Sequence, residues 1–291
     1  MDISFITINY NGIQETCEMI DSLKNVLQSV SYEIIVVDNA SKNDEADRLI
    51  EKYKDQIVVI KSKENKGFAG GNNLALSVAK GKYLFFINND TFVEEDGMHS
   101  LVERLESSDK IGMVCPKLRF SWDNRPIQFA GFTPLSRVTL RNSGIGCGED
   151  DRGQYDKAHP TPFAHGAAMM VKREVLENVG PMYEGYFLYY EEMDWSSRIT
   201  EGGYEIWYEP RCTVFHKESM STGRVSPLKT YYMTRNRLLF ARRNRKGLSK
   251  LLCYMYLTSV AVLRDIPKHI LTHRKDLAAS TYKGLKDFYK M

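Results

Sequence analysis

Strand-like and helix-like patterns alternate along the first third of the chain. Runs rich in branched and aromatic residues predict buried strands, and they lie at 3–9, 33–38, 57–60, 83–87 and 112–116. A polar turn and a segment with apolar residues at helical spacing follow each of the first four. Short connections between strand, helix and strand are typical of a Rossmann-like α/β domain, with a mostly parallel sheet flanked by helices.

The regular alternation ends in the middle of the chain. Residues 119–162 are rich in glycine and proline, which is typical of a binding loop or lid, although a surface excursion without a role fits as well. An apolar run at 163–171 predicts a strand, and a helix is expected from Arg173. Residues 205–209 and 212–216 then predict two further strands.

Polar side chains stand at the ends of several predicted strands. Asp38 and Asp90 follow buried strands, and His216 ends the last one. In open α/β sheets, ligands bind beyond the carboxyl ends of the strands, so Asp90 lies where a cation or a phosphate-bearing ligand is expected. Asn and Asp also favour simple turns, and a lone His is usually a satisfied polar residue, so both interpretations stay open at this point.

A glycine-rich turn at 65–73 precedes a predicted helix. Its free backbone N–H groups and the positive helix end could face phosphate oxygens, although such turns are common without a ligand. The turn is not a GxGxxG motif and follows the third strand, which argues against a nicotinamide cofactor.

Three acids lie among aromatic residues at 187–195. Apolar neighbours raise the pKa of a carboxylate and make it a better base, so Glu191, Glu192 and Asp194 are candidate catalytic bases. They could instead favour the start of the helix that follows, through its dipole.

The net charge of +3 hides an asymmetry between the two ends of the chain. Residues 217–291 contain 17 Lys or Arg and four acids, and the remainder is acidic. We therefore expect a body at 1–216 and a basic helical extension at 217–291 that seeks anions, either anionic lipid or nucleic acid. The uncharged stretch 251–263 is too short to span a bilayer and suits either a buried helix or one at a membrane interface.

Cysteine usage and the first residues bear on the compartment. The five cysteines are scattered and lack CxxC spacing, which suggests neither a disulfide framework nor a zinc cluster. The first residues enter a strand pattern without the features of a signal peptide. A cytoplasmic location is expected.

Taken together, the motifs resemble those of the family 2 glycosyltransferases. The resemblance covers roughly residues 3–240, and within the family it is strongest to the bacterial rhamnosyltransferase-like branch that builds surface polysaccharides. The motifs occur in family order at 3–12, 34–41, 65–73, 86–90, 165–169, 190–195 and 214–216.

The resemblance implies a GT-A fold with a donor half at about 1–116 and an acceptor half at about 117–216. It implies an inverting mechanism with Glu192 as the general base. The residues that it implies for the nucleotide-sugar are Asn9, Asp38, Asn65, Gly67, Gly71, Asn72, Asn89 and Arg235.

A divalent metal is also implied, with Asp90 and His216 as ligands of Mn²⁺ or Mg²⁺. The sequence departs from the family pattern in two places. Asn88-Asn89-Asp90 offers one carboxylate where many relatives have two or three, and Glu192 stands where Asp is more usual. His216 is therefore expected to be an important partner of Asp90.

The function expected is transfer of a sugar from a dTDP- or UDP-activated donor, such as dTDP-rhamnose, to a lipid-linked or polysaccharide acceptor. The enzyme is expected in the cytoplasm, in contact with the anionic inner face of the cytoplasmic membrane, and nucleic acid is not an expected partner. The thinned metal motif leaves an alternative, a non-catalytic nucleotide-sugar-binding or scaffold protein.

Overall fold

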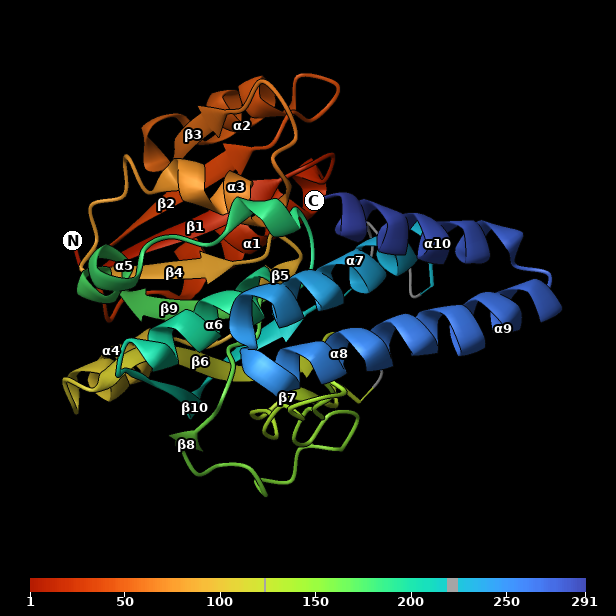
Figure 1. Ribbon diagram of the computed structural model, residues 1–291. Coiled ribbons are helices and arrows are strands. Elements are labelled where there is room, and N and C mark those ends of the chain that lie inside the picture. Colours follow the sequence, from red (N-terminus) through yellow and green to blue (C-terminus); the bar gives the residue numbers. More distant parts are fainter. Residues whose placement is uncertain (123, 219–224) are drawn as a thin grey trace.

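A ten-stranded sheet forms the centre of the part of the chain that the computed structural model describes, residues 1–122, 124–218 and 225–291 (Figure 1). The strand order is β3-β2-β1-β4-β9-β6-β10-β5, with β7 beside β6 and β8 beside β10. The strands are β1 (Ile3–Asn9), β2 (Tyr32–Asp38), β3 (Val58–Lys61), β4 (Tyr83–Ile87), β5 (Thr91–Phe92), β6 (Ile111–Phe120), β7 (Ile127–Phe129), β8 (His159–Pro160), β9 (Ala168–Lys172) and β10 (Glu205–His216).

Helices cover the sheet and form a separate layer near the C-terminus. The helices of the body are α1 (Ile13–Val26), α2 (Glu45–Tyr53), η1 (Lys54–Gln56), α3 (Gly67–Ala75), α4 (Met98–Glu106), α5 (Arg173–Val179), η2 (Glu184–Tyr186) and α6 (Glu191–Glu201). The C-terminal layer contains α7 (Pro227–Asn244), α8 (Gly247–Val260), the π-helix η3 (Ala261–Asp265), α9 (Ile266–Leu271) and α10 (Lys275–Lys290). These last helices extend beyond the sheet on one side (Figure 1).

The direction of the strands gathers the predicted polar ends at one edge. β1 is parallel to β2 and β4, and β6 is parallel to β10. β9 lies between the two groups and is antiparallel to both β4 and β6. The residues that precede β9 therefore lie at the same edge as the carboxyl ends of β4 and β10.

Burial explains why the central strands read so clearly in the sequence. All five residues of β4 are buried; Phe85 contacts the ring of Phe5 in the neighbouring strand β1, and Phe86 contacts the ring of Trp195 in α6. A second apolar cluster joins the C-terminal layer to the body, and it includes Leu140, Tyr186, Tyr190, Leu238 and Phe240. The basic extension thus packs on the body through an apolar core of its own.

Three predicted elements have different limits in the structure. The strand expected at 163–171 begins only at Ala168, because the residues before it turn and Ala168 N–H donates to the His165 carbonyl. The two strands expected at 205–216 are one strand with a bulge around Pro210, whose missing N–H cannot continue the ladder. The turn expected at 65–73 is largely the helix α3.

Among the described residues, none of the helices has both the length and the apolarity that crossing a membrane requires. The five cysteines are all free thiols. The stretch 119–162 is mostly irregular, with the short strands β7 and β8 within it.

Candidate active site

A buried hydrogen-bond network joins the carboxyl ends of β2, β1 and β4. Asn9 Nδ2 lies 2.8 Å from Asp38 Oδ2, and Asn9 Oδ1 accepts from the Thr16 hydroxyl at 2.7 Å. Asn89 Nδ2 donates to Thr16 Oγ1 at 3.0 Å. The structure therefore brings together three of the predicted donor-binding residues, through a threonine that the sequence did not single out.

Asp38 is held firmly at this edge. Its second oxygen, Oδ1, accepts from the backbone N–H of Ser41 at 3.0 Å, and the residue is only 5% exposed. Its predicted contact with a nucleobase stays a prediction.

The start of α3 differs from the expectation of free N–H groups. Lys66 N–H donates to Asn39 Oδ1, Gly67 N–H to Asn65 Oδ1, and Phe68 N–H to the Phe187 carbonyl. The expectation is wrong for these three amides, because side chains and a neighbouring loop already accept their hydrogen bonds.

The two predicted glycines of this segment approach protein atoms closely. Gly67 has φ +70°, and a Cβ there would come within 2.0 Å of the Phe187 carbonyl oxygen. A Cβ on Gly71 would come within 2.7 Å of Ile8 Cδ1, and the Asn72 amide is buried and donates to the Phe68 carbonyl. Close packing against Phe187 and Ile8 thus explains why glycine stands at both positions, and contact of these glycines with the donor stays a prediction.

Asp90 and His216, the two metal ligands that the resemblance implies, lie side by side, and their binding of a metal stays a prediction. Asp90 Oδ1 is 3.1 Å from His216 Nε2, and β5 brings the two together because Thr91 pairs with His216. On its other side, His216 Nδ1 is 2.9 Å from Gln128 Oε1. An amide oxygen can only accept, so Nδ1 donates to Gln128, and Nε2 is the ring nitrogen on the Asp90 side that a neutral imidazole would offer to a metal ion.

This geometry fits a divalent cation. Two neighbouring ligands of an octahedral ion at about 2.1 Å lie about 3 Å apart, close to the observed separation of Oδ1 and Nε2. In the described parts of the chain, no group of three His, Cys, Asp or Glu side chains could hold a metal. An ion here would therefore need further oxygen ligands from a bound substrate or water.

Residues 165–167 connect the Asp90–His216 pair to the predicted base. The rings of His165 and His216 are 6.3 Å apart, and the Ala167 carbonyl accepts from Asn88 N–H at 2.9 Å. At Gly166, an added Cβ would lie 3.7 Å from Glu192 Cγ. Burial, with the adjacent His216 adding to its effect, lowers the pKa of His165 to about 3, so its imidazole stays neutral.

The three candidate bases have distinct environments. Asp194 is buried and accepts hydrogen bonds from Tyr186, Arg198, Arg243 and Asn244, so its pKa is lowered although burial acts against this. Glu191 is 2% exposed, and within the described structure its Oε2 has no hydrogen-bond partner. Glu192 is half-buried and reaches Gly166. Of the three, Glu192 best combines access with freedom from an ion pair.

Burial raises the pKa values of both glutamates. Burial raises the pKa of Glu192, although backbone N–H groups at the start of α6 oppose the shift. Burial and the neighbouring charge of Glu192 raise the pKa of Glu191 well above its usual value. A raised pKa makes Glu192 a stronger proton acceptor than an exposed glutamate.

Helix α7 holds the loop that leads into α6. Asn236 is completely buried, and its Nδ2 lies 2.7–2.9 Å from the carbonyl oxygens of Tyr186, Leu188 and Tyr189. Arg235 donates to the carbonyls of Gly185 and Tyr186. The structure therefore places the Arg235 guanidinium on this loop, and its predicted contact with the donor stays a prediction.

The same loop has an unusual backbone. Phe187, Tyr189 and Tyr190 have φ angles of +67°, +70° and +79°, which are uncommon for residues with bulky side chains. Such conformations persist where surrounding contacts over-determine them. The hydrogen bonds from Arg235 and Asn236 of α7 hold the loop in this conformation directly before Glu191 and Glu192.

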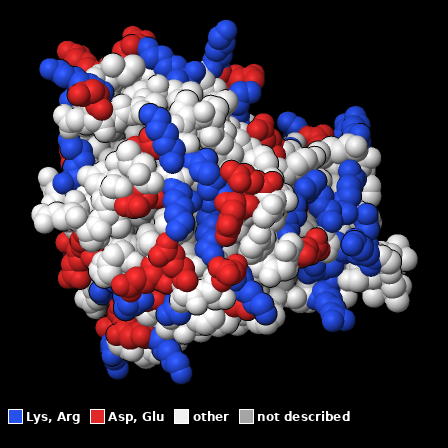
Figure 2. Space-filling view, turned by 90° about the vertical axis from the view of Figure 1, so that its left-hand side faces the viewer, with Lys and Arg blue, Asp and Glu red and all other residues white. Residues whose placement is uncertain are grey.

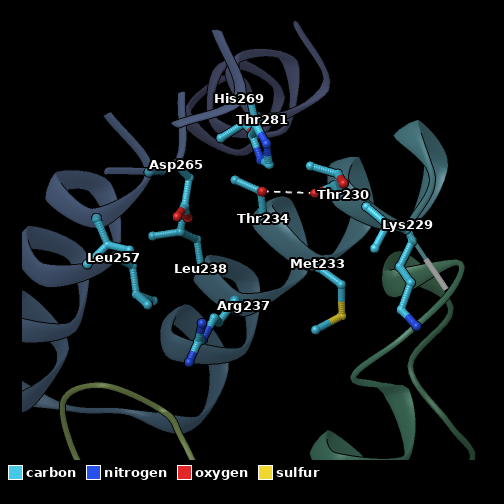
Figure 3. Close-up of a pocket in the computed structure, with 13 residues that line it drawn as sticks. Lys229, Thr230, Met233, Thr234, Arg237, Leu238, Leu257, Asp265, His269 and Thr281 are labelled. Carbon is cyan, nitrogen blue, oxygen red and sulfur yellow. Dashed lines mark hydrogen bonds between the residues drawn. The ribbon is translucent and has the colours of Figure 1, made fainter. Parts of the chain in front are cut away.

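A cavity of about 300 Å³ lies within the C-terminal layer (Figure 3). Residues from α7 form one wall, including Met233 and Arg237, and Leu257 and Asp265 lie across from them. Arg237 Nη2 donates to the carbonyls of Thr139 and Leu140, whereas its buried Nε has no partner among the described residues. Burial raises the pKa of Tyr190 to about 12, with the charges of Arg237 and Glu192 acting on it in opposite directions.

Sequence reasoning missed Gln128, Thr16 and Asn236. Gln128 lies in the irregular stretch, where no periodic pattern marks it. Thr16 is one of several polar residues in the first turn of α1. Asn236 had a usable signal, because Asn is unfavourable inside a helix unless its side chain has a specific partner.

A family model and the similar curated proteins all point to glycosyltransferases. The family model described as "Glycosyl transferase family 2" matches residues 4–180. The low-salt glycan biosynthesis hexosyltransferase Agl10 of Haloferax volcanii is 26% identical over 247 residues, 82% of this chain and 75% of that protein. A poly-β-1,6-N-acetyl-D-glucosamine synthase of Staphylococcus aureus is 28% identical over 215 residues, 72% of this chain, which spans only 48% of that protein.

Solved structures share the fold at low sequence identity. Residues 1–349 of S. aureus TarS align with a TM-score of 0.61 at 15% identity, over 99% of this chain and 80% of that one. The mannosyltransferase PcManGT of Pyrobaculum calidifontis, solved with GDP-Man and Mn²⁺, aligns with a TM-score of 0.59 at 17% identity, over 98% and 74%. These likenesses confirm the predicted GT-A fold.

The family model covers more than half of the chain, and its range includes Asn9, Asp38, Asp90 and the α3 segment, whereas Glu192 and His216 lie beyond it. The chain belongs to glycosyl transferase family 2.

Proposed function

We propose that the protein is an inverting glycosyltransferase that uses a nucleotide-sugar donor and builds a cell-surface glycan. The observation that carries the proposal is the placement of Asp90, His216 and Glu192 around the short segment 165–167. A site for a donor diphosphate and a site for a proton acceptor thereby lie at the same edge of the sheet, where ligands of such sheets bind.

Glu192 acts as the general base in this proposal. The acceptor hydroxyl oxygen attacks the anomeric carbon from the face opposite the diphosphate, and its proton passes to the Glu192 carboxylate. The bond from the anomeric carbon to the diphosphate breaks, and its electron pair leaves with the nucleoside diphosphate. One displacement of this kind inverts the anomeric configuration.

Asp90 and His216 would hold Mn²⁺ or Mg²⁺, with the donor diphosphate supplying further oxygen ligands. When bound, the ion offsets the negative charge that develops on the leaving diphosphate. Gln128 orients His216 by accepting its Nδ1 proton, as outer partners of metal-bound histidines commonly do. Mn²⁺ in structural neighbours is consistent with divalent metal use.

The donor and acceptor classes are proposed from the ligands of similar structures and from the family resemblance. UDP, UDP-GlcNAc and GDP-Man are bound in similar structures, which supports a nucleotide-sugar in general. We assign residues 1–116 to the donor and 117–216 to the acceptor, and we retain a dTDP- or UDP-sugar, such as dTDP-rhamnose, as the first donors to test. We likewise retain a lipid-linked or polysaccharide acceptor, at the inner face of the cytoplasmic membrane, as the first acceptor class to test.

A thermal-shift screen tests the proposal. Nucleotide-sugars are added to the chain with and without Mn²⁺, and a bound donor raises the melting temperature in proportion to its occupancy. We expect stabilisation by one base class, stronger with Mn²⁺ and weaker for the Asp90→Asn variant. The proposal fails if no donor of any base stabilises the protein under either condition.

A non-catalytic nucleotide-sugar-binding protein is the second candidate, because one carboxylate replaces two or three in the metal motif. Both candidates predict the same thermal shifts. Slow, Mn²⁺-stimulated release of nucleoside diphosphate from the stabilising donor separates them, since only the enzyme produces it.

A further inference from the structure

An apolar stripe runs along the outer face of the C-terminal helix that α8, η3 and α9 form together. Eight large apolar side chains are exposed there, and we call them the outer stripe: Leu248, Leu251, Leu252, Met255, Val262, Leu263, Ile270 and Leu271. Leu248, Leu263 and Leu271 are 69%, 76% and 79% exposed. Most of the stripe recurs at spacings of three and four, which places those side chains on one face of a helix.

The inner face of the same helix is satisfied by the protein. Cys253, Leu257 and Ala261 are buried and belong to the apolar cluster that α7 and α10 complete. The helix thus has two apolar faces, and packing within the described chain covers only one. On the body, Ile50 and Val78 are 42% and 37% exposed, and single exposed apolar side chains are normal for a protein surface.

Positive charge surrounds the stripe. Asp265 is the only acidic residue between Glu218 and Asp276, and it is paired with Arg264 at 2.7 Å. Lys246, Lys250 and Lys268 accompany the helix, and Arg274 and Lys275 follow it. In the space-filling view both signs are interspersed over the body, whereas Lys and Arg predominate on the part of the surface at the right (Figure 2).

The chemistry of this face decides among possible occupants. A second copy would bring two cationic borders together around the stripe, which like-charge repulsion opposes. A bilayer with anionic headgroups accepts the apolar side chains at the level of its acyl chains and attracts the surrounding cations. Exposed tyrosines add to this fit, since Tyr289 lies beside α8 with its hydroxyl 2.6 Å from Thr258 Oγ1, and tyrosine favours membrane interfaces.

We propose that the outer stripe inserts into the surface of an anionic lipid bilayer, with the helix of residues 247–271 lying in the plane of the interface. The protein is then a peripheral membrane protein. This proposal goes beyond the catalytic one, because a scaffold protein with the same surface would bind in the same way.

Vesicle co-sedimentation of the full chain tests it without any substrate. One set of vesicles contains phosphatidylcholine alone, and the other contains phosphatidylcholine with phosphatidylglycerol. We expect binding to the anionic vesicles that weakens as salt is added. The double variant Leu248→Asp/Leu263→Asp should lower the partition coefficient about tenfold or more.

The matched control is Ile50→Asp/Val78→Asp, which changes two exposed apolar residues on the body and should bind as the unchanged chain does. Melting temperatures confirm that each variant is folded. Equal binding of the two double variants, or no binding to anionic vesicles, overturns the proposal. So does a dimer in light scattering that the Leu248/Leu263 variant abolishes while vesicle binding persists, because the stripe is then a contact between copies.

Discussion

Glu192 differs from the neighbouring acids in what surrounds its carboxylate rather than in its position along α6. Asp194 accepts hydrogen bonds from two arginines, and one carboxylate oxygen of Glu191, Oε2, is buried without a hydrogen-bond partner among the described residues. Glu192 contacts Gly166, where a side chain is missing. The sequence could nominate all three acids, but only the packing separates them.

The pH dependence of transfer should report the raised pKa of Glu192. The base works only when ionised, so kcat/KM should fall as the pH drops through a value above the ordinary pKa of a glutamate, about 4.3. A pH profile of initial rates measures this acidic limb. An acidic limb centred at or below the ordinary glutamate value contradicts the assignment.

Stability should fall as the pH rises through the raised pKa of Glu191. A carboxyl group whose pKa is higher in the folded state favours folding when it is protonated, and this contribution is lost as the folded group ionises. The Glu191→Gln variant should flatten this decline in melting temperature, measured between pH 5 and 9, whereas Glu174→Gln at an exposed site on α5 should not. An unchanged decline in Glu191→Gln places the titrating group elsewhere.

The metal pair gives a separate residue-scale prediction. His216→Ala removes the nitrogen ligand and leaves Asp90 alone, so the Mn²⁺ concentration for half-maximal donor stabilisation should rise about tenfold or more. Gln128→Ala should give a smaller rise, because it frees the His216 ring without removing it. Equal Mn²⁺ dependence in all three proteins excludes this pair as the metal site.

At the scale of elements, α7 fixes the entrance to α6. The sequence indicates that this part of the chain is basic, and the family resemblance places Arg235 among the donor-binding residues. In the structure Arg235 and Asn236 bind carbonyl oxygens of the loop at 185–189. Such contacts join residues about 50 positions apart, which is why no local pattern could predict them.

Asn236→Ala tests the positional role of α7. The change leaves carbonyl groups of a strained loop without their donor and should lower the free energy of unfolding by about 1–3 kcal/mol. If the loop positions Glu192, kcat should fall while KM for the donor stays within about twofold. Asn178→Ala, at an exposed position on α5, is the control, and a proportional loss of kcat at this control would mean that the effect is unspecific.

Gly67→Ala tests whether α3 is shaped by packing. The new Cβ would overlap the Phe187 carbonyl at a positive φ, so the unfolding free energy should fall by more than about 1 kcal/mol. Chemical denaturation measures the loss. A variant of normal stability that binds donor poorly would show that the glycine serves the ligand rather than the loop.

The sequence shows where the central strands lie much more clearly than it shows which strands pair with each other. β1, β2 and β4 are buried on both faces, so their apolar runs are continuous and their ends are marked by Asn9, Asp38 and Asn88. The antiparallel insertion of β9 depends on contacts more than 80 residues away, such as Ile87 with Ala168. The same non-local pairing places residues 165–167 at the site.

At the scale of the whole molecule, the candidate active site and the proposed membrane-binding surface belong to two different regions. The acidic body carries the strand edge with Asp90, His216 and Glu192, and the basic layer carries α7 and the outer stripe. The sequence predicted this division from its charge and left open whether 251–263 is buried or interfacial. The structure shows one buried and one exposed apolar face on the same helix.

The central claim is that Glu192 accepts the proton of the attacking hydroxyl. The most direct measurement compares Glu192→Gln with the unchanged chain for donor affinity and for transfer rate, using the donor that the thermal-shift screen identifies. Donor affinity should stay within about twofold while transfer falls about 10²- to 10⁴-fold, the usual contribution of a general base. Transfer at the normal rate by Glu192→Gln would contradict the account.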